Sequence, residues 1–68
     1  MTARRIEYTA AYTARGFIGL VRDGDGSIVI VDHDPCDWNG AMEAAGCRAA
    51  QLISMYRRRG VDAIAYKI

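Results

Sequence analysis

The sequence has few of the residues that usually build metal or covalent sites. It holds one histidine, one proline, one tryptophan and two cysteines in 68 residues. Two cysteines are too few for a disulfide scaffold. Cys36 and Cys47 should stand about ten residues of helix, roughly 15 Å, apart, which is too far for a disulfide. We therefore expect two reduced thiols in a cytosolic protein.

A long apolar run is also missing. No stretch reaches the ~20 apolar residues needed to cross a bilayer. The N-terminal segment MTARRIEYTA has basic residues but no apolar run behind them, so we expect no signal peptide. These absences predict a cytoplasmic protein without a membrane partner.

A strong excess of one charge is the third absence. The formal net charge is +1, so bulk electrostatics favour neither a nucleic-acid binder nor a polyanion that mimics one. Hydrophobic residues, in contrast, make up 51% of the chain. We expect a single domain over residues 1–68, with apolar surface left over for a partner or a second copy.

Apolar and polar residues alternate over residues 5–13, which predicts a half-buried strand. Gly16 breaks the alternation and can supply the positive φ of a tight turn. The segment RDGDGS predicts a hairpin, and Gly19 suggests a bulge or a close backbone contact. The other strands are expected at residues 17–22, 27–32 and 61–68.

A continuous apolar stripe predicts one long helix, formed by Trp38, Met42, Ala45, Ala49, Leu52 and Tyr56. Two starts are open: Asp34 as N-cap with Pro35 in the first turn, or Asp37 as N-cap with Gly40 at N3. Gly60 is expected to end the helix. The order is β-β-β-α-β, an α+β fold whose four-stranded, mostly antiparallel sheet carries one helix on one face.

This order predicts two charged ends and one open face. The helix returns toward the hairpin tip, so Arg57–Arg59 should lie near Asp23 and Asp25. The helix start should lie at the other end, with Arg15 and Lys67. The strands at residues 17–22 and 27–32 carry apolar side chains on both faces. One helix covers only one face, so we predict that the other is a contact surface and a possible homodimer interface.

The segment VDHDPCDWNG, residues 31–40, gathers candidate metal ligands. Zinc sites usually draw ligands from two separated pairs, and the second pair is missing because the chain has no other histidine. Strand alternation also directs His33 away from Asp32 and Asp34. We therefore predict no metal and no cofactor, and we interpret the aspartates as helix caps.

Catalysis by a Cys–His pair has only His33 with Cys36 or Cys47 to draw on. A helix N-terminus favours a thiolate, which leaves the reactivity of Cys36 open. One helix in 68 residues leaves little concavity for a substrate. No Ser–His–Asp spacing, phosphate loop or pair of glutamates stands out, so we predict a protein that is not an enzyme.

Charge patterning offers two possible working surfaces. Acidic side chains should cluster at the helix start and dock on a basic surface, such as a nucleic-acid channel of another protein; they are Asp32, Asp34, Asp37 and Glu43. Capping and solubility are the plainer explanation. The alternative is a basic end formed by Arg4, Arg5, Arg57, Arg58 and Arg59. No aromatic ladder accompanies these arginines, so direct nucleic-acid binding is not favoured.

The layout of the middle of the chain resembles the HicB-like antitoxin domain. The segment GFIGLVRDGDGSIVIVDHDPCDW followed by AMEAAGCRAAQLI is similar to that family's hairpin, Pro-Gly-Cys-like turn and helix. The glycine of that turn is missing between Pro35 and Cys36, and the DNA-binding segment is absent. The resemblance implies toxin binding and puts autoregulation in doubt.

In length and layout the chain also resembles phage-encoded anti-CRISPR proteins. These are short domains, often one sheet and one helix, that block Cas complexes. The segments VRDGDGSIVIV and VDAIAYKI, on either side of an Ala-rich helix, carry this resemblance. We therefore predict a non-enzymatic inhibitor that binds a Cas surveillance complex in the host bacterial cytoplasm.

Overall fold

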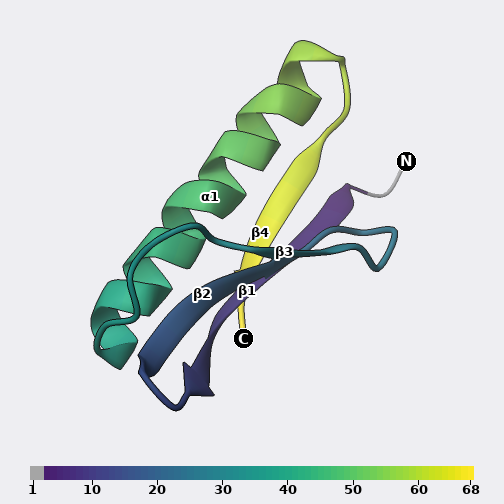
Figure 1. Cartoon of the computed structure of the whole chain (residues 1–68). Coiled ribbons are helices and arrows are strands. Elements are labelled where there is room, and N and C mark those ends of the chain that lie inside the picture. Colours follow the sequence, from purple (N-terminus) through teal and green to yellow (C-terminus); the bar gives the residue numbers. More distant parts are fainter. Residues whose placement is uncertain (1–2) are drawn as a thin grey trace.

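The computed structural model describes residues 3–68. Residues 1 and 2 lie outside this range; they belong to the expected domain and to the N-terminal segment in which no signal peptide is expected. The elements follow the predicted order (Figure 1). They are β1 (Arg4–Thr13), β2 (Gly16–Arg22), β3 (Ile28–Ile30), α1 (Trp38–Arg58) and β4 (Ala63–Lys67). The predicted α+β fold is confirmed.

The four strands form one mixed sheet in the order β3-β2-β1-β4. β1 pairs antiparallel with β2, and β2 antiparallel with β3, while β4 lies parallel to β1. The parallel pairing follows from the connection, because α1 carries the chain back across the sheet before β4 begins. β1 and β2 are therefore the central strands, and β3 and β4 are the edges.

The helix begins with the second of the two predicted starts. Asp37 is the N-cap, and its side chain accepts a hydrogen bond of 2.8 Å from the Gly40 N–H. At the other end Gly60 has φ +78°. The Val61 N–H donates to the Tyr56 carbonyl, which completes a glycine C-cap. Both ends of α1 are thus fixed by residues that the sequence identified.

Two strands are shorter than predicted. The strand expected at residues 27–32 is shorter in the structure. The strand pairing of β3 with β2 stops after Ile30, and beyond it the His33 side chain accepts a hydrogen bond from the β2 backbone. The expectation at residues 61–68 was also too long. The Val61 N–H is used to close the helix, so β4 begins at Ala63.

The core under α1 is small. Its buried residues are Ile6, Val21, Ala41, Met42, Ala45, Ala49, Leu52 and Ala63, half of them alanine. Small side chains let the helix lie close to the sheet. A Cβ added at Gly19 would stand 2.9 Å from the Ala41 carbonyl oxygen and 3.0 Å from the Ala45 nitrogen. The close-contact interpretation of Gly19 is therefore correct.

The second face of the sheet carries large aliphatic side chains and no covering element in residues 3–68. The strand register places Leu20 and Ile30 side by side on this face, and Arg5 beside Ile64. Ile28, Ile30, Ile64 and Ile68 are exposed by 49–65%. Within residues 3–68 no helix has the length and apolar character needed to cross a membrane.

Candidate functional site

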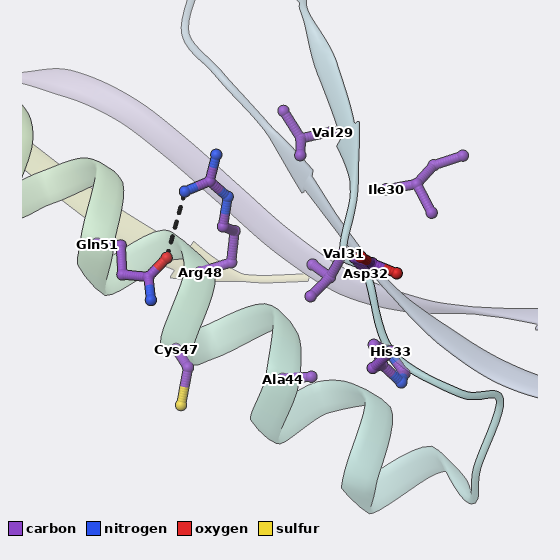
Figure 2. Close-up of a pocket in the computed structure, with 9 residues that line it drawn as sticks. All are labelled: Val29, Ile30, Val31, Asp32, His33, Ala44, Cys47, Arg48 and Gln51. Atoms are coloured by element: carbon purple, nitrogen blue, oxygen red, sulfur yellow. Dashed lines mark hydrogen bonds between the residues drawn. The ribbon is translucent and has the colours of Figure 1, made fainter.

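A groove runs between the edge strand β3 and α1 (Figure 2). The helix packs over β1, β2 and β4 and does not approach β3, which leaves this space open. It encloses about 560 Å³. Its lining combines aliphatic and charged side chains: Val29, Ile30, Val31, Asp32, His33, Ala44, Cys47, Arg48 and Gln51.

The segment from residue 31 to 36 continues the sheet beside β2 through both backbone and side-chain hydrogen bonds. The Val31 N–H donates to the Gly19 carbonyl, and Cys36 and Phe17 exchange backbone hydrogen bonds of 2.8 and 3.0 Å. Between them the Gly19 N–H donates to Nε2 of His33 at 2.9 Å. The imidazole thus takes the place of a backbone acceptor and attaches the segment from residue 31 to 36 to β2.

This position fixes the chemistry of His33. A backbone N–H is only a donor, so Nε2 is the acceptor and the neutral ring carries its proton on Nδ1. Nδ1 lies 2.8 Å from the Asp34 carbonyl oxygen, to which it donates. Cys36 Sγ lies 3.9 Å from the same Nδ1. In this arrangement neither ring nitrogen has a lone pair free to take the thiol proton, so the Cys36–His33 pair lacks the geometry of an activated nucleophile.

The predicted acidic residues are distributed around one end of the groove. Asp32 lines it, and Asp34 is exposed in the next turn of the loop. Glu43 precedes Cys47 by about one helical turn and therefore lies on the same side of α1. Asp37 differs from the others because its carboxylate is already engaged as the N-cap.

The acidic side chains at this end are exposed and available. Asp32, Asp34 and Glu43 form no ion pair and no side-chain hydrogen bond within the described part of the chain. Helix α1 also brings one cation to the groove. Arg48 lies on the α1 side of the groove and donates to Oε1 of Gln51 at 3.2 Å (Figure 2). The surface is therefore an apolar groove with free carboxylates and one arginine.

Two of the five arginines of the basic end are engaged within the chain. Nε of Arg4 donates to Asp23 at 2.6 Å, and its guanidinium lies 4.7 Å from the centre of the Tyr56 ring. The Tyr56 hydroxyl also donates to Asp23. Burial alone raises the pKa of Asp23, but hydrogen bonds from Arg4, Tyr56 and the Gly24 N–H outweigh it and lower the pKa.

Arg5 is similarly engaged. It donates to Glu7 at 3.1 Å and stacks 4.0 Å from the centre of the Tyr66 ring. Arg22 also donates to Glu7, and the hydrogen bonds from Arg22 and Arg5 lower the pKa of that carboxyl. Of the five predicted basic residues, Arg57, Arg58 and Arg59 are exposed without an ion pair within residues 3–68.

The topology predicted that the helix end and the hairpin tip meet, with Arg4 and Arg5 at the same end, and the contacts of Asp23 with Tyr56 and Arg4 agree with it. The ion pairs of Asp23 and Asp25 in residues 3–68 come from Arg4, and not from Arg57–Arg59. At the opposite end Lys67 lies 5.4 Å from the centre of the Trp38 ring, as the topology implied. Sequence reasoning missed the roles of His33 and Arg48. A lone histidine two residues beyond a β-branched run gives no signal of strand extension.

The comparisons with known proteins give no match to a family model, to a curated protein or to a solved structure.

Proposed function

We propose that the chain is a non-enzymatic inhibitor that acts by binding another protein, in the manner of an anti-CRISPR protein on a Cas complex. The groove between β3 and α1, with its free carboxylates, is the working surface. One observation carries the proposal: Asp32, Asp34 and Glu43 are exposed beside an apolar groove and have no internal counter-ion in residues 3–68.

The composition of the groove supports a protein ligand with a basic, partly aliphatic contact. Val29, Val31 and Ala44 offer apolar area, while the carboxylates attract lysine or arginine. A Cas complex holds its nucleic acid with such basic side chains. Carboxylates that pair with those side chains would compete with the nucleic acid for them.

A plaque assay tests this proposal. The chain is expressed in a panel of bacterial strains, each with one active CRISPR system and a phage that the system targets. We expect the plating efficiency of the phage to rise in at least one strain, and to stay unchanged in a matched strain without the system. If the plating efficiency rises in none of the strains, the Cas-directed function is overturned.

The HicB-like alternative rests on the similar layout of hairpin, turn and helix and also works by protein contact. Co-expression with a toxin of that class separates the two. Rescue of growth without any effect on phage plating would favour the antitoxin function and contradict the inhibitor.

A nucleic-acid module is the candidate from another class, and it would use Arg57, Arg58 and Arg59. Internal pairing of Arg4 and Arg5 reduces the charge that it can offer to phosphate. We expect no shift of DNA or RNA in a gel at low salt. A shift that weakens steeply with salt would favour the nucleic-acid module instead.

A further inference from the structure

The structure assigns the open face of the sheet to a second copy of this chain: two molecules pack sheet against sheet, and both helices lie outside. The face consists of the outward side chains of all four strands and the C-terminal residue. Its apolar members are Ile18, Leu20, Ile28, Ile30, Ile64, Tyr66 and Ile68.

The distribution of apolar volume is the first argument. Half of the buried residues in the described part of the chain are alanine, and the larger ones are Ile6, Val21, Met42 and Leu52. A second group of aliphatic side chains lies on the open face, outside this core. A domain of this size has little apolar burial to spare, so leaving its larger aliphatic residues in water removes a main source of stability.

The area of the face is the second argument. Ile28, Ile30, Ile64, Tyr66 and Ile68 are 40–65% exposed. Together they present on the order of 550 Å², and the adjoining Ile18 and Leu20 extend the patch toward the roughly 800 Å² per partner of a stable interface. A patch of this size is at the upper end of the roughly 300–600 Å² of the largest apolar patch on a typical monomer, and such patches are often functional.

Shape favours a second copy, and the charge on the face argues against a basic partner. The charged side chains that the register places on this face are Arg5, Glu7 and Arg22, and both arginines pair with Glu7, which leaves one net positive charge. The face therefore has no free carboxylate to attract a basic partner. It carries a hollow of about 310 Å³ beside Leu20, Ile28 and Ile68. Protruding side chains lie on the same face, so one surface holds both parts of a two-fold contact.

This contact is independent of the proposed inhibitor function. The open face and the acidic groove involve different residues, apart from Ile30 at the edge strand. A dimer built through the sheets presents two acidic grooves on its outside. Loss of the dimer and loss of inhibition are therefore separate outcomes.

Sedimentation equilibrium of the whole chain over a wide concentration range tests the contact. We expect a mass about twice the 7.5 kDa of one chain. Ile28→Glu, at a residue that does not line the acidic groove, should raise the dimer dissociation constant at least about a hundredfold, because a two-fold interface buries the new charge twice. Val61→Glu is the matched control, since Val61 is 40% exposed between α1 and β4 and outside this face. It should remain a dimer.

Engineered cysteines test the orientation, including the case in which Ile28→Glu does not fold. In a chain with Cys36→Ser and Cys47→Ser, we expect a short thiol-specific cross-linker to join two molecules through Thr9→Cys near the middle of the face, because packed sheets lie roughly 10 Å apart. Ser54→Cys on the exposed side of α1 should not be cross-linked. A folded wild-type monomer at every concentration would overturn the proposal and leave the face to a different protein. Cross-linking through Ser54→Cys but not Thr9→Cys would overturn the sheet-to-sheet geometry.

Discussion

At the scale of single residues, Gly19 decides how closely α1 lies on the sheet. A Cβ at this position would meet backbone atoms of Ala41 and Ala45, which cannot move aside cheaply. We predict that Gly19→Ala lowers the free energy of unfolding by about 1–3 kcal/mol, measured by urea denaturation.

Gly46 provides the matched control for this substitution. It lies within α1, and a Cβ there would make only ordinary contact, at 3.5 Å, with the Tyr8 ring. Gly46→Ala should raise the stability by up to about 1 kcal/mol, because alanine is the better helix former. A neutral Gly19→Ala would mean that the helix stands farther from β2 than described.

His33, a candidate metal ligand or base in the sequence, serves in the structure as a hydrogen-bond acceptor for the backbone of β2. We predict that His33→Ala removes the acceptor of the Gly19 N–H and lowers the free energy of unfolding by about 1–3 kcal/mol. Amide hydrogen exchange should show faster exchange at Gly19, while the amide of Glu7 in β1 is unaffected. Full protection of Gly19 in the variant would contradict the hydrogen bond to Nε2.

Asp23 gives the protein a dependence on acid pH. Hydrogen bonds hold the folded pKa of Asp23 below its ordinary value of 3.8. A depressed folded pKa adds stability above the unfolded pKa, and this is lost as the pH falls through the folded value. We therefore predict that the free energy of unfolding decreases below about pH 4, in urea titrations at successive pH values.

Asp23→Asn tests the origin of that dependence. The variant should be less stable than the wild type near neutral pH and should show a shallower fall in acid, because it no longer loses a paired carboxylate. Asp32→Asn is the control, because Asp32 has no ion pair in residues 3–68. An acid slope that is the same in Asp23→Asn and the wild type would contradict the role of Asp23.

At the scale of elements, the start of α1 distinguishes the two aspartates that the sequence left open. Asp37 caps the helix, whereas Asp34 makes no side-chain hydrogen bond in the described residues. We predict that Asp37→Ala costs about 1 kcal/mol of stability. Asp34→Ala should cost almost none, and Asp37→Ser should restore most of the loss. Thermal unfolding followed by circular dichroism measures all three, and a larger loss from Asp34→Ala would reverse the assignment.

Most elements could be predicted because their signals are local. The Asp-Gly pairs after Arg22 specify a hairpin, and the stripe from Trp38 to Tyr56 specifies the helix. The end of β3 could not be predicted, because it depends on the His33 side chain reaching Gly19 from another part of the chain. The parallel place of β4 beside β1 is also a long-range outcome.

Only part of the candidate site could be predicted from the sequence, because the rest also depends on long-range contacts. The acidic residues are close in sequence, so their gathering at the helix start could be expected. Arg48 lies outside that stretch and reaches the groove through the pitch of α1. Whether Asp32 and Glu43 are paired depends on the partners of the arginines. Arg4 pairs with Asp23, and Arg5 and Arg22 pair with Glu7.

At the scale of the whole molecule, the two charged ends are not equivalent. At the hairpin tip, Arg4 and Tyr56 satisfy the Asp23 carboxylate and so contribute to stability, while Arg57–Arg59 at the same end are exposed without an ion pair in residues 3–68. The end at the helix start leaves carboxylates exposed without internal partners in residues 3–68. From this difference we propose that the end at the helix start is the binding surface and that the open sheet face takes a second copy.

The most direct test of this assignment is phage plating in a strain whose CRISPR system the wild-type chain inhibits. Asp32→Asn, Asp34→Asn and Glu43→Gln are combined in one variant, which leaves the Asp37 cap intact. Arg57→Gln, Arg58→Gln and Arg59→Gln form the matched control. We predict that the acidic variant loses inhibition by at least about tenfold while remaining folded, and that the basic variant keeps it. Full inhibition by the acidic variant with loss in the basic one would contradict the account.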